Sequence, residues 1–408
     1  MRIVDVQAYA IRAPNPAREA YWGRRAWVLG HEAGGRGGAP ATAFGEYPPR
    51  WRMRALYSEH FETTVVKVTT DQGVVGWGEG KAPVAPEATR EIVHHVLRPV
   101  LLGADPTNVE VLWERMYSLM RMRGHTTGFL LEAISGVDIA LWDILGKVTG
   151  LPVCQLLGGC YRDKVLMYAS IGGGDEKTPD QMVRDVERFL KLGFKAVKIR
   201  MHWWANRLDA NPEKDYQMFK AVRKLVGEGF PLSFDVNNGY SVPTAIMQGK
   251  RFQELGIYHY EEPVPQYDYA GIAQVADALE VPVSAGEQEY TRWQFRDLIT
   301  QARVDIVQPD VVKCNGITEI KKIAVLAETY NKHFVPHQTQ PTIGTAANLH
   351  VVASIQSATR PQEFTGQRPE LDALFKEPLV LQDGYIHVPQ KPGLGLELIQ
   401  SKLEELAL

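Results

Sequence analysis

Apolar and polar positions follow two different periods along the chain, and the change between them divides it into regions. Residues 3–10 and 62–70 alternate with a period of two, which is typical of strands, and Asp-Gln-Gly at 71–73 indicates a turn after the second. From 86 to about 150 the apolar residues follow a helical period, with an apolar run at 133–145. The first part of the chain is therefore predicted to combine a few strands with several helices.

Beyond this region, short apolar runs and helical stretches alternate regularly. The apolar runs predict eight strands, near residues 165–170, 196–200, 232–236, 257–260, 281–284, 304–307, 333–336 and 361–364. Helical stretches fill the gaps, for example 179–191, 214–227, 317–330 and 343–355. Strands that alternate with helices in this way favour a TIM-type barrel, in which functional residues gather at the C-terminal ends of the strands.

These patterns predict the division of the chain into three parts. Residues 1–150 form an N-terminal α+β unit, 151–375 form the barrel, and 376–408 contain turns and a short helix that return to the N-terminal unit. The long segment 13–58 is rich in Arg, Trp, Gly and Pro. A loop of that length is expected to be either a functional lid or disordered.

Composition narrows the class of protein. A chain of 408 residues with 45% hydrophobic and 23% charged residues is typical of a soluble globular protein of two domains. A net charge of −3 gives no indication of a nucleic-acid partner. No apolar run is long enough for a membrane span, and the first residues lack the apolar core of a signal peptide, so a cytoplasmic location is expected.

The three cysteines give no pattern of their own. Cys154, Cys160 and Cys314 are odd in number and have no CxxC spacing, so neither a disulfide framework nor a zinc site is expected. Cys154 and Cys314 are interpreted as packing residues.

Three acidic residues follow consecutive predicted strands at equal intervals. Asp235, Glu261 and Glu287 are each 26 positions apart, which fits one strand, one helix and two short loops per step. In a parallel barrel this spacing brings the three carboxylates together at one rim. Clustered carboxylates repel one another unless a cation lies between them, and oxygen ligands favour a hard ion such as Mg²⁺. The sequence therefore predicts a magnesium site.

Two cations end the second predicted barrel strand, in Lys198-Ile199-Arg200. Residues two apart in a strand face the same side, so both side chains are able to point at one site. Beside a metal, they would offset the negative charge that develops when a substrate carboxylate becomes an enediolate. The alternative is that they form a surface ion pair.

The later strands supply a candidate acid–base group. Asp310 and His337 end the sixth and seventh strands and are 27 positions apart, again one strand–helix step. Asp310 would accept a hydrogen bond from one ring nitrogen of His337 and leave the other for proton transfer. Glu363, near the end of the eighth strand, would bind a substrate carboxylate if protonated, or would serve only as a polar residue of the rim.

The chain resembles the enolase superfamily in its mandelate racemase subgroup. The resemblance rests on KVTTDQGVVGWGE at 67–79 and AISGVDIALWD at 133–143, followed in order by the motifs at 198–200, 235–237, 261–263 and 286–287 and by Asp310 and His337. These motifs cover nearly the whole chain.

This resemblance implies an α+β capping domain and a (β/α)₇β barrel. It implies one Mg²⁺ per chain, held by Asp235, Glu261 and Glu287, and abstraction of the proton α to a carboxylate. It also implies that Lys198 and the His337–Asp310 pair flank the substrate, that Glu363 polarises it, and that the protein is a homo-oligomer.

One position departs from the subgroup. The usual motif is Lys-x-Lys, with the second lysine as an acid–base group, but position 200 is Arg. Arginine rarely gives up a proton, so a two-base racemisation is disfavoured. His337 alone would suffice for a dehydration in which the proton and the hydroxyl leave from one face. His202 is a weak alternative base, or only a loop histidine, and Lys313 is interpreted as structural.

The sequence therefore favours a Mg²⁺-dependent dehydratase that converts an aldonic or aldaric acid into a 2-keto-3-deoxy acid. A racemase, epimerase or cycloisomerase would share the same first step, and a non-catalytic metal-binding relative is a further alternative. The predicted substrate contacts are Asn237, Glu262, His202, Arg24 and Trp22.

Overall fold

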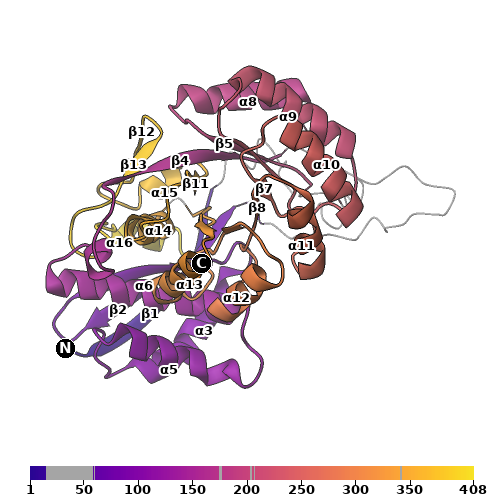
Figure 1. The fold of residues 1–408 in the computed structure, drawn as a ribbon. Coiled ribbons are helices and arrows are strands. Elements are labelled where there is room, and N and C mark those ends of the chain that lie inside the picture. The colour runs from indigo at the N-terminus through magenta and orange to yellow at the C-terminus, as the bar shows by residue number, and fades with distance from the viewer. Residues whose placement is uncertain (15–57, 59, 174–176, 203–204, 206, 341) are drawn as a thin grey trace.

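A computed structural model describes residues 1–14, 58, 60–173, 177–202, 205, 207–340 and 342–408 (Figure 1). The expected lid at 13–58 falls almost wholly outside these residues, together with Arg24 and Trp22.

The N-terminal region combines a small antiparallel sheet with helices. The sheet has the order β1 (Ile3–Ala13), β2 (Phe61–Thr70) and β3 (Val75–Gly80). Its helices are α3 (Pro86–Ile92), the π-helical turn η1 (Val93–Leu97), α4 (Arg98–Leu101), α5 (Val109–Arg121) and α6 (Phe129–Thr149). The predicted strands, the turn at 71–73 and the helical region are confirmed, and this unit is the capping domain.

Helix α6 is mostly buried and lies against β3. Every second residue of β3 is glycine on the side that faces the helix, at Gly76, Gly78 and Gly80. A Cβ at these positions would collide with backbone carbonyls of α6, those of Ala140, Gly136 and Glu132 respectively. The glycines therefore let the helix and the strand approach more closely than side chains would permit.

The second region is a barrel of eight parallel strands among the described residues. The strands are β4 (Lys164–Ile171), β5 (Val197–Arg200), β6 (Leu232–Asp235), β7 (Tyr260–Glu261), β8 (Val283–Ala285), β9 (Ile306–Val307), β10 (His333–Phe334) and β11 (Gln362–Phe364). Neighbours pair in sequence order from β4 to β10, and β11 pairs in parallel with β4.

One long helix follows each of the first seven strands. They are α8 (Pro179–Lys191), α9 (Pro212–Val226), α10 (Val242–Glu254), α11 (Tyr269–Ala278), α12 (Arg292–Thr300), α13 (Gly316–Thr329) and α14 (Ile343–Ala353). The short helix α7 (Val153–Leu156) precedes the barrel. The predicted (β/α)₇β architecture is confirmed. Figure 1 shows α8 to α11 on the side of the molecule away from β1, β2 and α5.

Several barrel helices begin at residues whose side chains cap the free backbone N–H groups. Thr178 and Gln181 form a capping box at α8, and Pro179 occupies its first turn. The Asp268 carboxylate accepts from the Gly271 N–H at the start of α11. Such caps fix where each helix starts, and hence the length of the loop that leaves each strand end.

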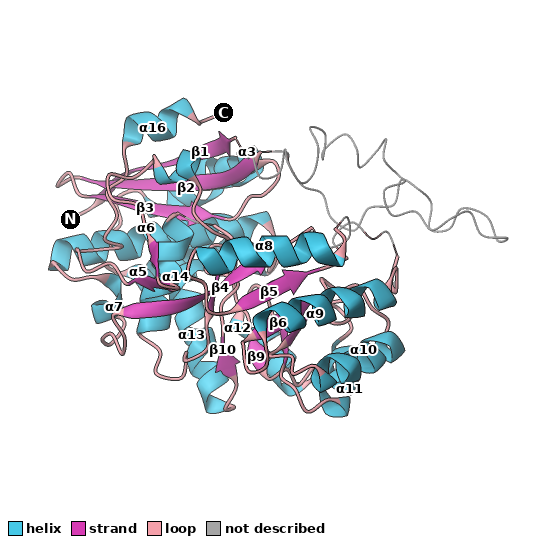
Figure 2. Ribbon diagram, turned by 90° about the horizontal axis from the view of Figure 1, so that it is seen from above, coloured by secondary structure: helices cyan, strands magenta, loops and turns pink. Residues whose placement is uncertain are grey.

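The C-terminal segment contacts both regions. After α15 (Pro369–Asp372), the hairpin of β12 (Leu381–Gln382) and β13 (Tyr385–His387) pairs antiparallel with β4, which the sequence did not indicate. The chain then reaches α16 (Gln400–Glu405), and the Leu408 N–H donates to the Ala10 carbonyl in β1. Figure 2 shows α16 beside β1. The exact domain boundaries remain predictions.

The interpretation of Cys154 as a packing residue is wrong. Cys154 and Cys160 form a disulfide, with Cα atoms 5.5 Å apart, because the turn after α7 folds the chain back over six positions. The remaining cysteine, Cys314, is buried and reduced. Among the described residues, no helix has the length and apolar character needed to span a bilayer.

Candidate active site

Strand register places the acidic residues at one rim of the barrel. Arg200 lies beside Asp235, and Asp235 lies beside Glu261, across the pairs β5–β6 and β6–β7. Glu261 lies beside Ser284, and Glu287 follows β8 by two residues. Asp235 and Glu261 are buried, so two carboxyl groups lie next to each other with little solvent.

Lys198 is the cation at the centre of this rim. Its Nζ lies 2.5 Å from Glu261 Oε1, 3.3 Å from Glu363 Oε1 and 3.8 Å from Asp235 Oδ2. Burial alone would lower the pKa of Lys198, but the charges of Glu261 and Glu363 raise it well above its ordinary value. Lys198 is therefore protonated in this arrangement and acts as a fixed positive charge.

Asp235 is held by the loop that follows it. Its two oxygens accept from Asn237, one from the backbone N–H at 2.7 Å and one from the side-chain amide at 2.9 Å. Glu262 accepts from the Asn238 amide at 2.7 Å, so it is oriented by the same loop. Burial and the neighbouring acids, Glu287 first, raise the pKa of Glu262 well above its ordinary value.

The oxygen-only donor set fits a magnesium ion. The described residues contain no group of three or more acidic, histidine or cysteine side chains already gathered around a metal position. Lys198 offsets part of the negative charge at this rim, because it contacts Glu261. Even with Lys198 there, burial and the charge of Glu261 raise the pKa of Asp235 well above its ordinary value. The charged form of Asp235 is therefore disfavoured beside Glu261 without a further cation, and Asp235, Glu261 and Glu287 would supply the carboxylate ligands that Mg²⁺ prefers.

His337 lies among three carboxylates. Its Nδ1 is 2.8 Å from Asp310 Oδ2. Its Nε2 is 3.3 Å from Glu287 Oε2 and 3.7 Å from Glu363 Oε2. The Asp310 contact fixes one ring nitrogen and leaves Nε2 directed at the acidic rim, which is the geometry that a general base at this site requires.

Glu363 connects the histidine to the lysine. Oε2 accepts from the Gln338 N–H at 3.0 Å, and Oε1 faces Lys198. Burial would raise the pKa of Glu363, but the charges of Lys198 and His337 lower it below its ordinary value. Glu363 is therefore ionised in this arrangement and accepts hydrogen bonds. It would have to be protonated before it could donate one to a substrate carboxylate.

The remaining predicted residues lie at the edges of the rim. The guanidinium of Arg200 packs against Gly172 after β4, and Arg200 lies beside Asp235 in the register of β5 and β6. His202 is buried, and its Nε2 bonds to Asp215, which also accepts from Tyr240. Lys313 donates to the Glu287 carbonyl at 2.6 Å and to Gln288 at 2.9 Å, which agrees with a structural role.

Three further residues touch the site and were missed from the sequence. Gln308 donates to Glu261 Oε2 at 2.7 Å, and His259 Nε2 lies 3.3 Å from the same oxygen. His259 is two residues before Glu261, so strand alternation was a signal that both face one side. The third is Lys81 of the capping domain, whose Nζ donates to Asp310 Oδ2 at 2.8 Å.

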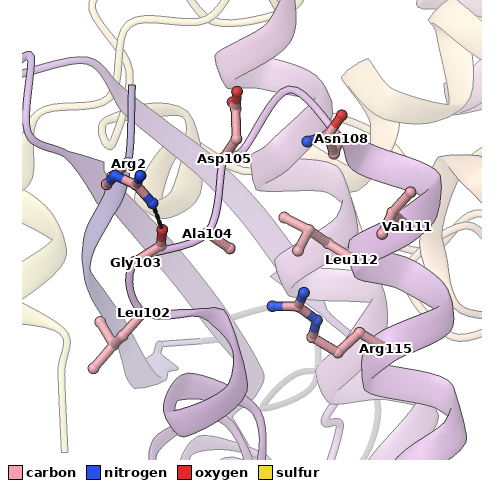
Figure 3. Close-up of a pocket in the computed structure, with 9 residues that line it drawn as sticks. All are labelled: Arg2, Leu102, Gly103, Ala104, Asp105, Asn108, Val111, Leu112 and Arg115. Carbon is pink, nitrogen blue, oxygen red and sulfur yellow. Dashed lines mark hydrogen bonds between the residues drawn. The ribbon is translucent and has the colours of Figure 1, made fainter.

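A separate cleft of about 380 Å³ lies away from this rim, between the start of β1 and α5. Figure 3 shows Arg2 at one side of it, bonded to the Gly103 carbonyl at 2.7 Å, and Arg115 and Asn108 at the other. All of its lining residues come from the capping domain, and none of them is among the residues described at the rim.

Family models match both regions of the chain. Residues 51–158 match the mandelate racemase / muconate lactonizing enzyme N-terminal domain, and residues 181–402 match the enolase C-terminal domain-like family.

Relatives of known sequence and solved structures agree with these matches. The arabinonate dehydratase of Saccharolobus solfataricus is 35% identical over 86% of this chain and 92% of its own. The D-galactarolactone cycloisomerase of Agrobacterium fabrum is 34% identical over 84% of this chain and 91% of its own. A mandelate racemase/muconate lactonizing protein from Paracoccus denitrificans, solved as a magnesium complex, has a TM-score of 0.83 and 33% identity, and the match covers 100% and 98% of the two chains.

Proposed function

The chain belongs to the mandelate racemase subgroup of the enolase superfamily, and from this premise we propose that it is a Mg²⁺-dependent dehydratase of an aldonic or aldaric acid. Its dehydratase relatives place the enzyme among the lyases. Their sugar-acid substrates motivate the proposed substrate class.

Asp235, Glu261 and Glu287 would hold the metal ion. When bound, magnesium would balance the negative charge that builds up on the substrate carboxylate as the α-proton leaves. Lys198 and Arg200 add positive charge on the neighbouring strand, and neither is asked to give up a proton.

His337 would carry the proton. Its Nε2 would take the α-proton of the substrate while the Nδ1–H is held by Asp310 at 2.8 Å. The same Nε2–H would then protonate the departing β-hydroxyl, which leaves as water and returns the ring to its starting state. The remaining enol becomes a 2-keto-3-deoxy acid. The Asp310–His337 pair at the acidic rim is the observation that carries this proposal.

A substrate screen tests the proposal. The magnesium-loaded enzyme is incubated with a library of aldonic and aldaric acids, and formation of 2-keto acids is measured. We expect at least one member to lose one water and to form a 2-keto acid only when Mg²⁺ is present. Exchange of the α-proton with solvent deuterium, without loss of water, would contradict dehydration and retain the enolate step.

The cycloisomerase relative supports the second candidate, an isomerase that uses the same first step. Its product would have the same mass as the substrate, whereas dehydration removes the mass of one water. A protein that catalyses no α-proton exchange with any acid in the screen would instead be a non-catalytic relative.

A further inference from the structure

Lys81 links the capping domain to the acid–base pair of the barrel. It directly follows β3, and its backbone N–H donates to the Val312 carbonyl at 2.7 Å. Its side chain, 15% exposed, reaches the barrel, where Nζ lies 2.8 Å from Asp310 Oδ2 and 3.4 Å from His337 Nδ1. One residue of the cap therefore contacts both members of the pair.

The contacts of Asp310 show what Lys81 adds. Oδ1 accepts from the Val312 N–H at 3.1 Å. Oδ2 accepts from Lys81 and His337, each at 2.8 Å. The Val312 residue thus contacts Asp310 through its N–H and Lys81 through its carbonyl. Burial would raise the pKa of Asp310, but the charge of Lys81 is the largest of the effects that lower it.

The surroundings of His337 explain why the position of Asp310 matters. The ring has Asp310 at one nitrogen and Glu287 and Glu363 at the other. Three carboxylates compete for two ring nitrogens, so the ring orientation depends on how firmly each carboxylate is held. A buried carboxylate without its cation is poorly held, because it must satisfy its charge from the remaining donors.

We propose that Lys81 is a positioning residue of the acid–base pair: it holds Asp310 Oδ2 against His337 Nδ1, so that Nε2 stays directed at the substrate. The inference rests on the proposed function for the role of His337, but the contact that it describes does not depend on the substrate. The cap would then contribute to the chemistry through one lysine as well as by covering the barrel.

Histidine NMR tests the contact without any substrate. The magnesium-loaded protein is labelled with ¹⁵N-histidine, and the signal of His337 among the 11 histidines is assigned with His337→Gln. We expect the hydrogen-bonded Nδ1–H signal of His337 to broaden or move upfield in Lys81→Met, and to persist in Lys81→Arg. An unchanged or downfield-shifted signal in Lys81→Met would overturn the proposal.

A matched control removes another lysine of the capping domain. Lys67 lies on β2, and its Nζ bonds to Gln400 at 2.9 Å, away from the barrel rim. Lys67→Met is expected to leave the His337 signal unchanged. Melting temperatures of all variants show whether they fold.

A double-mutant comparison tests the catalytic consequence. If Lys81 acts through Asp310, Lys81→Met should lower the rate of α-proton exchange by about 10²-fold in the wild-type background, with KM nearly unchanged. In an Asp310→Asn background it should lower the rate no further. Equal losses in both backgrounds would overturn the proposal.

The substrate screen and the histidine NMR experiment distinguish failure of the proposed function from failure of the proposed role of Lys81. A failed substrate screen would reject the proposed function and leave the NMR result standing. An unperturbed His337 signal would reject the role of Lys81 even in an active dehydratase.

Discussion

At the residue scale, the site separates one proton carrier from several fixed charges. Lys198 is bound by two carboxylates that raise its pKa well above the ordinary value. Arg200 is unsuited to proton transfer by its chemistry. His337 combines a nitrogen fixed by Asp310 with one directed at Glu287 and Glu363 of the rim. The fixed positive charges at this site are therefore Lys198 and Arg200 on β5, and the proton carrier is His337, which follows β10.

Replacing His337 with Asn should abolish both dehydration and α-proton exchange. General acid–base catalysis contributes about 10²–10⁴-fold, and a residue that acts in both steps is expected to cost at least that much. The measurements are 2-keto acid formation and NMR of the α-proton in D₂O. Exchange at the wild-type rate in His337→Asn would instead assign the base to the opposite face, to Lys198 or to His202.

Replacing Arg200 with Lys should cause only a partial loss of kcat. The substitution keeps the positive charge next to Asp235 but loses the planar fork of the guanidinium. Steady-state kinetics of Arg200→Lys and Arg200→Met give the comparison. We expect Met to be the more damaging change, and equal losses in both variants would contradict an electrostatic role.

The positions of some site residues could be predicted from the sequence, and those of others could not. Equal spacing predicted the neighbouring strand ends of Asp235 and Glu261, because parallel strands end at the same rim. The contact of Lys81 with Asp310 joins residues 229 positions apart. The periodicity of apolar residues within a segment does not predict how the capping domain packs on the barrel. The contact of Lys81 with Asp310 could therefore be seen only in the structure.

At the element scale, helices and strand order were easier to predict than strand ends. The stretch 179–191 is α8 (Pro179–Lys191), because a capping box and a proline mark its start. The fourth barrel strand was expected near 257–260 but is β7 (Tyr260–Glu261). Short apolar runs show that a strand exists and not where its pairing begins.

A buried carboxylate joins α6 to α13 across the boundary between cap and barrel. Asp138 accepts from the Thr318 hydroxyl at 2.6 Å and from the Thr318 N–H at 2.9 Å. Burial raises the pKa of Asp138 to about 7, and the bonds from Thr318 oppose that rise. Between the unfolded pKa, about 4, and this folded value, the folded protein holds a proton that the unfolded chain has lost. Stability from this residue therefore falls as the pH rises through that window.

Thr318→Val should destabilise the protein more at pH 8 than at pH 5.5. The change removes the hydroxyl that donates to Asp138, and the charged carboxylate at pH 8 needs that donor most. A loss of about 1–3 kcal/mol is expected at the higher pH. Melting temperatures at the two pH values give the measurement.

Thr149→Val provides the control for this pH dependence. Thr149 lies on α6, the helix that carries Asp138, but its hydroxyl donates to backbone carbonyls, at Leu145 and Gly146. Its replacement should have the same small effect at both pH values. A pH-independent loss in Thr318→Val would show that Asp138 does not change its charge in this range.

At the scale of the whole molecule, folding buries several acidic side chains close together at one rim of the barrel, which costs free energy. Asp235, Glu261, Glu262 and Glu363 are buried within one end of the barrel, and burial together with neighbouring acids raises the pKa values of Asp235 and Glu262. A ligand that binds only the folded state stabilises it in proportion to the logarithm of its concentration. A divalent cation at this rim would therefore stabilise the entire fold.

Saturating Mg²⁺ should raise the melting temperature, and the effect should depend on the predicted ligands. At a free concentration of 100 times Kd, binding adds about 2.7 kcal/mol to the free energy of unfolding. The double variant Asp235→Asn/Glu287→Gln should melt at the same temperature with Mg²⁺ or with EDTA. Asp105→Asn, in the cleft beside α5, should keep the wild-type response, because that acid lies on the capping domain away from the rim. A magnesium response that survives in the double variant but is lost in Asp105→Asn would move the metal site out of the barrel.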